Sequence, residues 1–208
     1  MDRNRPKSML VTSEMMQKGK IPLLFTGGAC NIQSLTGPIR NPGRDPLTAW
    51  LDAQGWSYYD PQIHPSTHGR EYVWGIDGPE EKRARKLAQL RVYEITADTI
   101  AAVSVMEIMD DARVGRHSIV WFNGGQTFAP PGLGDLDQLV KNKALQQQIG
   151  EMAYQHLLAY LKAGRQIRHE LPLMLAECPH IVFVNSFDEL QKAITILIPK
   201  LIKTSVTL

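Results

Sequence analysis

Ser104 and Glu107 are the residues whose types and spacing point first to chemistry. They lie in the stretch VSVMEIMDD, between the apolar runs LRVYEIT and SIVWF. Projected onto a helix, Val105 and Ile108 share an apolar arc and Glu107 lies on the other side. A carboxylate in the first turns of a helix, facing the end of a buried strand, can act as a nucleophile. The sequence therefore makes Glu107 a candidate catalytic residue, with Ser104 beside it in the site.

The same spacing also has a purely structural explanation. Ser-x-x-Glu is the capping-box pattern, in which Ser104 would cap a helix and Glu107 would be its third residue. The chain repeats this spacing at Ser186 and Glu189, where the last predicted helix begins. The spacing alone therefore leaves both roles of Glu107 open.

Two glycines follow the first predicted strand, in the stretch FTGGACN. Gly27 and Gly28 would let the backbone come close to a ligand, or would simply make a tight turn. The stretch is neither a dinucleotide-binding fingerprint nor a phosphate loop. Both interpretations stay open, and in the first of them the glycines form the floor of a pocket.

Acids and aromatic residues follow a second predicted strand, in YYDPQIHPSTHGREYVWGIDG. Asp60 precedes a proline and is held extended, so its carboxylate can bind sugar hydroxyls, although Asp-Pro is also a common turn. Trp74 can stack on a nucleobase or pack its loop onto the sheet. His64 and His68 would bind a metal only if a helix lay beneath them, and the neighbouring proline and glycine argue against one.

A sheet of buried strands must position these candidates. Runs of β-forming apolar residues predict strands that begin near Ile21, Trp56, Leu90, Ser118 and His180. Helical patterns alternate with them, which predicts an α/β, doubly wound fold: a flavodoxin-like five-stranded parallel sheet with helices on both faces. In such folds, ligands bind beyond the carboxyl ends of the strands.

Capping signals and periodicity predict the helices and leave two long loops between them. Asp45 begins one helix, Gly55 ends it, and Pro79 lies in the first turn of another. Further helices are predicted over residues 99–115, 136–164 and 186–202, and the long loops over 64–78 and 124–135. The helix from residue 136 has apolar residues to spare, so it either covers the sheet or forms a subunit interface in a homo-oligomer.

Length and composition predict one globular domain with a small-molecule partner. The chain has 208 residues, 43% of them hydrophobic, and its net charge of +2 gives no argument for a nucleic-acid or membrane partner. Cys30 and Cys178 lack metal-ligand spacing, which favours reduced cysteines and no metal site. The charged N-terminus does not resemble a secretion signal. We expect a cytoplasmic protein with a flexible arm over residues 1–19 and a single domain over residues 20–208.

The order of these features resembles a known family over roughly residues 21–200. A strand ending in TGG, a helix carrying Trp50, a YYDP exit and a long aromatic loop are followed by a strand, Ser-x-x-Glu-Ile, a glycine and another strand. This order is similar to the nucleoside 2-deoxyribosyltransferase family, particularly its divergent deoxyribosyltransferase-like branch. The resemblance implies an enzyme acting on the N-glycosidic bond of a (deoxy)nucleoside or nucleotide, by 2-deoxyribosyl transfer between nucleobases or by hydrolysis, with Glu107 as the nucleophile.

The resemblance also implies roles for the remaining candidates. Asp98 would assist protonation of the leaving base or position the ribose, and Asp60, Asp77 and Trp74 would line the sugar and base pocket. The chemistry needs no cofactor, since an ionised carboxylate can stabilise or trap the positive charge that develops at C1′.

One position departs from the family pattern. Characterised enzymes of the family carry an acid where this chain has Ala101. The departure keeps open a second hypothesis, a catalytically inactive nucleotide-binding sensor or accessory domain of the same fold. A third hypothesis, flavin binding, is disfavoured because TGGACN offers a phosphate group a single hydroxyl, that of Thr26.

Overall fold

The computed structural model describes residues 8–28, 31–34, 37–40, 44–97, 99–125, 128 and 136–205, and for residues 31–34, 37–40 and 204–205 it describes the backbone alone. One sheet contains five parallel strands, in the order β4 (Tyr58–Tyr59), β1 (Leu24–Gly28), β5 (Leu90–Thr96), β6 (Ser118–Asn123) and β7 (Ile181–Val184). A separate antiparallel pair consists of β2 (Asn31–Ser34) and β3 (Gly37–Arg40). The described helices are α1 (Ser13–Gln17), α2 (Asp45–Gln54), α3 (Pro65–His68), α4 (Trp74–Leu87), α5 (Ala102–Val114), α6 (Leu136–Leu139), α7 (Lys143–Ile149), α8 (Glu151–Met174) and α9 (Phe187–Ser205).

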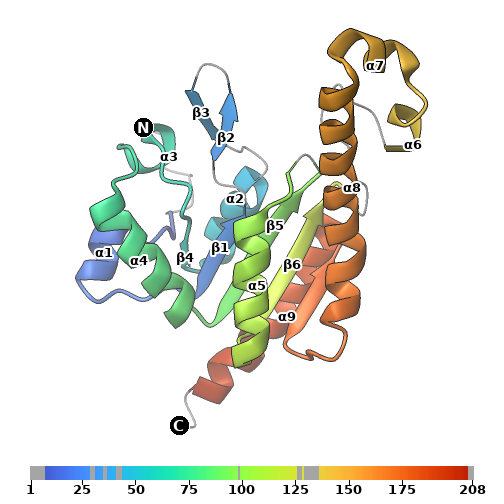
Figure 1. The fold of residues 1–208 in the computed structure, drawn as a ribbon. Coiled ribbons are helices and arrows are strands. Elements are labelled where there is room, and N and C mark those ends of the chain that lie inside the picture. The colour runs from blue at the N-terminus through green and yellow to red at the C-terminus, as the bar shows by residue number, and fades with distance from the viewer. Residues whose placement is uncertain are drawn as a thin grey trace.

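The strand order confirms the predicted fold class. The chain's second sheet strand, β4, lies outside β1, and β5, β6 and β7 follow on the other side, which is the flavodoxin-like arrangement of a doubly wound sheet. Figure 1 shows α5 and α8 in front of the sheet, with α2 and α9 behind it. The helices therefore cover both faces, and the carboxyl ends of the strands share one edge.

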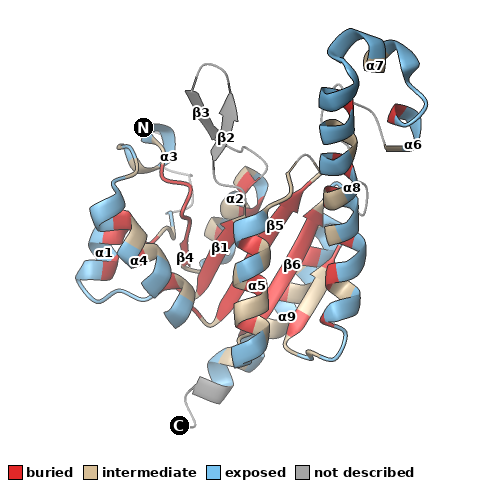
Figure 2. Cartoon of the chain, viewed as in Figure 1, coloured by how far each residue is buried: buried red, intermediate tan, exposed pale blue. Residues whose placement is uncertain are grey.

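Alternating side chains along each strand build the two halves of the core. In β5, Leu90 and Val92 pack into the cluster that contains α2 and α9 residues, whereas Tyr93 and Ile95 pack on the opposite face with Ile108 of α5. All seven residues of β5 are buried, as Figure 2 shows for the centre of the sheet. Burial on both faces explains the apolar side chains of LRVYEIT, and its two charged residues, Arg91 and Glu94, are buried with hydrogen-bond partners.

Residues 8–19 do not form the predicted flexible arm. Val11 and Met16 are fully buried, and the Val11 backbone N–H donates to the Tyr58 carbonyl at 2.7 Å. Helix α1 packs against α4, and Leu10 pairs with Tyr58 beside the sheet. The prediction failed because the charged residues of this segment mask a few well-spaced apolar side chains.

Several helix boundaries also differ from the predictions. Helix α4 begins at Trp74, so Pro79 lies inside it, and part of the predicted loop is helical. The predicted helix over residues 136–164 is three helices, divided near Asn142 and Gly150. Gly164 does not end its helix, because α8 continues to Met174. A Cβ at residue 164 would lie 2.5 Å from the Phe128 ring. Glycine at this position permits close packing of that ring against the helix.

Candidate functional site

A pocket of about 340 Å³ opens at the carboxyl end of β1, between α4 and α5. This volume falls in the range of roughly 300–1,000 Å³ that is typical of small-molecule sites. Its lining comes from β1, the exit of β4, α4 and the start of α5: Phe25, Gly27, Gly28, Pro61, Glu81, Ala101, Ala102, Val103, Ser104 and Glu107. The pocket thus lies at the sheet edge where this fold class binds its ligands.

Gly27 and Gly28 form the floor, and each has a steric reason to be glycine. A Cβ on Gly27 would lie 2.5 Å from the Tyr93 ring, and one on Gly28 would lie 2.5 Å from the Glu94 carbonyl oxygen. Gly28 also has a φ of 132°, which side chains rarely tolerate. The two interpretations from the sequence are therefore compatible, because the same glycines turn the chain and leave backbone exposed to the pocket.

The capping-box interpretation of Ser104 is wrong. Helix α5 has Ala101 as its N-cap, with a left-handed φ of 51°, so Ser104 is the third residue of the helix and is buried in the pocket wall. Glu107 lies one turn further along the helix and lines the same pocket. Neither residue is occupied in satisfying the first turn of the helix.

Glu107 is partly buried, with a quarter of its side chain exposed. Burial raises the pKa of Glu107 to about 7, an effect that the Arg85 guanidinium opposes and that the carboxylates of Glu81, Asp111 and Asp110 reinforce. Near neutral pH both the protonated and the ionised form of the carboxyl group are therefore populated. Perturbed acids in pockets are typical of catalytic sites.

Glu81 is a second acid in the pocket, and the sequence pattern did not indicate it. Burial raises the pKa of Glu81, opposed by a hydrogen bond in which the Tyr72 hydroxyl donates to Oε2 at 3.1 Å. Its position in the charged run PEEKRARK made it look like part of a solvated helix face. The pattern that could have revealed it is the spacing of Glu81 and Arg85, which puts both on the side of α4 that faces α5.

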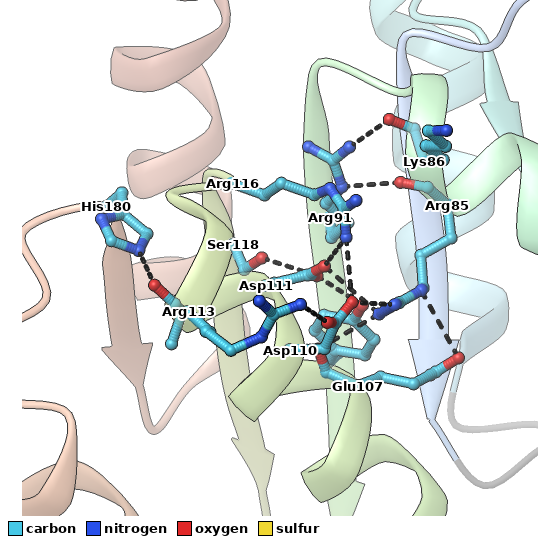
Figure 3. A network of polar contacts seen from close by, with 12 residues as sticks. Arg85, Lys86, Arg91, Glu107, Asp110, Asp111, Arg113, Arg116, Ser118 and His180 are labelled. Atoms are coloured by element: carbon cyan, nitrogen blue, oxygen red, sulfur yellow. Dashed lines mark hydrogen bonds and ion pairs between the residues drawn. The ribbon is translucent and has the colours of Figure 1, made fainter.

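A buried polar network fixes α5 relative to the sheet and to α4 (Figure 3). The Asp111 carboxylate, fully buried, accepts hydrogen bonds from the Tyr93 hydroxyl at 2.6 Å and from Arg85 and Arg116 at 3.2 and 3.1 Å. The hydroxyl of Ser118 adds a bond at 3.2 Å. A buried charge satisfied in this way holds its helix in one orientation, and Glu107 lies one turn away.

Asp60 does not line the pocket, although the neighbouring Pro61 does. Its carboxylate is buried and accepts from Arg44 Nη1 at 2.9 Å and from the Gln62 backbone N–H at 3.0 Å. Arg44, itself fully buried, also lies 3.5 Å from Glu94 Oε2 and donates to a backbone carbonyl of β1. In the described structure, Asp60 thus belongs to an ion cluster beneath the ends of the strands.

Asp77 and Trp74 also lie outside the pocket lining. Burial alone would raise the pKa of Asp77, but hydrogen bonds from Arg70, Ser13 and the Val73 backbone outweigh it and lower the pKa to about 2. Asp77 therefore joins α4 to α1 and to the preceding loop. The side chain of Trp74 is exposed and packs edge-on against Tyr72 at 5.3 Å between ring centroids.

Asp98 lies outside the described residues, so its predicted role stays a prediction. His64 caps the short helix α3 and His68 is its last residue, although no helix was predicted here. The proline and the glycine that argued against a helix mark its two ends. Among the described residues, no three His, Cys, Asp or Glu side chains group as metal ligands would. No described helix has the length and apolar character needed to cross a membrane.

Comparison of the sequence with models of protein families gives no match, and neither does comparison with curated proteins. The function must therefore be argued from the site itself.

Proposed function

We propose that this protein is an enzyme that acts on the N-glycosidic bond of a (deoxy)nucleoside or nucleotide, by 2-deoxyribosyl transfer or by hydrolysis. The observation that carries the proposal is the pairing of two glutamates from different helices, Glu107 and Glu81, in one pocket whose floor is bare glycine backbone. The resemblance of the chain's order of motifs to nucleoside 2-deoxyribosyltransferases supports the same conclusion.

In the first half of the reaction, Glu107 is the nucleophile and Glu81 the acid. The Glu107 carboxylate forms a bond to C1′ of the sugar as the bond from C1′ to the base nitrogen breaks. The electron pair of that bond goes to the base, which takes a proton from the Glu81 carboxylic acid. Burial raises the pKa of Glu81, which favours the protonated form that an acid needs, while the Arg85 guanidinium favours the ionised form of Glu107 that a nucleophile needs.

In the second half, an acceptor attacks C1′ and releases the sugar from Glu107. A second nucleobase as acceptor gives transfer, and water gives hydrolysis; either one loses a proton to Glu81 and restores the starting enzyme. The Tyr72 hydroxyl donates a hydrogen bond to one oxygen of Glu81 and so holds that carboxyl group in one orientation through both halves of the reaction. Glu81 thereby supplies the acid function that the alanine at position 101 cannot.

A second candidate function rests on Ala101. Enzymes of the family carry an acid at this position, and here the residue is an alanine with a φ of 51° that caps α5. A protein that kept the pocket and lost turnover would act as a nucleotide-binding sensor or accessory domain. Binding without product formation is the behaviour that distinguishes it from the enzyme.

One experiment separates the two functions. Purified protein is incubated with deoxynucleosides or their 5′-monophosphates, with and without a free acceptor base, and the products are resolved by chromatography. We expect base release or exchange that disappears in Glu107→Ala and persists in Glu189→Ala, the matched control at the other Ser-x-x-Glu stretch. Ligand binding without any product, measured by calorimetry on the same samples, would refute the enzyme and favour the sensor.

A further inference from the structure

Arg85 of α4 lies between the acids of α5, beside the carboxyl group of Glu107 (Figure 3). Its Nη1 donates to the Glu107 backbone carbonyl at 3.1 Å and to Asp111 at 3.2 Å, and its Nη2 donates to Asp110 at 2.7 Å. Its Nε lies 3.8 Å from Glu107 Oε1, an ion pair longer than a hydrogen bond. The guanidinium thus contacts both the backbone and the side chain of Glu107.

The sheet fixes the position of this guanidinium. Asp111, which accepts from Arg85, also accepts from the hydroxyls of Tyr93 in β5 and Ser118 in β6. The side chain of Arg85 is only 16% exposed, so its charge is screened weakly by solvent. A cation held so closely acts on Glu107 from a constant place.

We propose that Arg85 is a positioning residue for Glu107: it holds the carboxylate at the pocket wall and supplies the positive charge that stabilises the ionised form. Its consequence for catalysis rests on the proposed function, whereas its effect on the ionisation of Glu107 does not.

The other charged groups around Glu107 oppose Arg85. Glu81 faces it from α4, and Asp110 and Asp111 face it from α5. Asp110 disfavours ionisation of Glu107 in two ways. Its negative charge repels that of Glu107, and it accepts the shortest hydrogen bond that Arg85 donates to these acids, which draws the guanidinium charge toward Asp110. Removing Arg85 and removing Asp110 should therefore shift the ionisation of Glu107 in opposite directions. The Tyr93 hydroxyl, also near Glu107, stays neutral because burial raises its pKa strongly.

The test is a ¹³C NMR titration of the glutamate side chains, with the Glu107 signal assigned from Glu107→Gln. We expect Arg85→Met to raise the pKa of Glu107 by about 1 and Asp110→Asn to lower it by about 0.5. Arg85→Lys should raise the pKa of Glu107 less than Arg85→Met does, since lysine keeps the positive charge but lacks the several N–H donors of the guanidinium group. The matched control is Arg113→Met, which removes an exposed arginine that also pairs with Asp110 and should move the pKa by only about 0.2.

An unchanged Glu107 titration in folded Arg85→Met would overturn the inference. If that variant does not fold, because it leaves Asp111 short of a buried partner, Asp110→Asn decides. Asp110 is partly exposed and asparagine keeps its shape, so we expect this variant to fold, and a pKa of Glu107 that fails to fall overturns the inference equally. Titrations that shift as expected in a protein without glycosidic activity would refute the proposed function and leave the role of Arg85 standing.

Discussion

Two stretches of this chain share the spacing Ser-x-x-Glu and have different structures. At the start of α9, the Glu189 backbone N–H donates to Ser186 Oγ at 3.2 Å, and Glu189 Oε2 accepts from the Asn185 backbone N–H at 2.8 Å. The serine and the glutamate both satisfy backbone groups at the helix end. In α5, Ser104 and Glu107 lie inside the helix and line a pocket. Equal spacing therefore accompanies a cap in one place and a candidate active site in the other.

The difference lies in where each helix begins. Helix α9 begins at Phe187, directly after its serine, whereas α5 begins at Ala102, ahead of Ser104. The left-handed Ala101 starts the helix early, so Ser104 lies within the first turn instead of ahead of it and does not serve as its N-cap. The comparison teaches that a capping pattern has structural meaning only at the residue where the helix starts.

The largest expected difference between the two stretches is in activity. Glu107→Gln removes the proposed nucleophile and should lower kcat/KM for the proposed glycosidic cleavage by a factor of about 10³ or more. Glu189→Gln, at the cap, should keep it within about twofold of the wild type. Both are measured by base release under single-turnover and steady-state conditions. Equal losses in the two variants would remove the functional distinction between the stretches.

The next effect is on the pH dependence of stability. Because the pKa of Glu107 is about 7 in the folded protein and near 4.5 in the unfolded chain, the wild type loses stability as pH rises from about 4.5 to about 7. The glutamine of Glu107→Gln cannot ionise, so this variant does not lose stability in the same way. The free energy of unfolding of the variant minus that of the wild type should therefore increase over this pH range by on the order of 2 to 3 kcal/mol. Urea unfolding at a series of pH values measures the difference. A difference that stays flat would contradict the raised pKa.

The serines should differ in their contribution to stability at constant pH. Ser186→Ala removes an N-cap and should lower the free energy of unfolding by about 1 kcal/mol. Ser104→Ala removes no cap and replaces serine with a better helix former, so we expect a change within about 0.5 kcal/mol. Denaturant unfolding followed by circular dichroism compares the two. A larger loss at Ser104 than at Ser186 would reverse the assignment of the caps.

The smallest effect concerns Ala101, the N-cap of α5. Ala101→Gly relieves a left-handed alanine and should raise the free energy of unfolding by about 0.5 kcal/mol, after the greater entropy of glycine in the unfolded chain is subtracted. The control is the exposed neighbour, Ala102→Gly, which lies within the helix and should lower it by a similar amount. Changes of the same sign in both variants would argue against the early start of the helix.

Where burial decides the local structure, the sequence was sufficient to predict it. Strands β5 and β6 have the predicted bounds because a strand covered on both faces is built largely from apolar, β-forming side chains. Gly55 and Gly115 end their helices in the left-handed conformation that only glycine adopts readily. By contrast, the sequence wrongly predicted a helix end at Gly164, whereas α8 continues to Met174. The contact that explains this glycine is with the ring of Phe128, which is distant in sequence.

The site was predictable in part for the same reason. The two glycines stand at the end of β1 and Glu107 lies in the first half of the helix that follows β5, where the fold class itself places a crevice. Glu81 lies in the middle of a charged helix, and only the packing of α4 beside α5 brings it into the pocket. For Asp60 the prediction and the structure differ in the opposite direction. Its place at a strand end suggested a ligand contact, but the buried Arg44 forms an ion pair with it.

The contact between Gly27 and the Tyr93 ring has a consequence for how this protein can evolve or be redesigned. Tyr93 donates to Asp111, Asp111 accepts from Arg85, and Arg85 contacts Glu107, so the pocket floor and the candidate nucleophile are two ends of one chain of contacts. A larger residue at the floor would not simply narrow the pocket. It would push the ring and, through it, the carboxylate. New substrate preferences are therefore more accessible through the rim of the pocket, where a substitution leaves this chain of contacts intact.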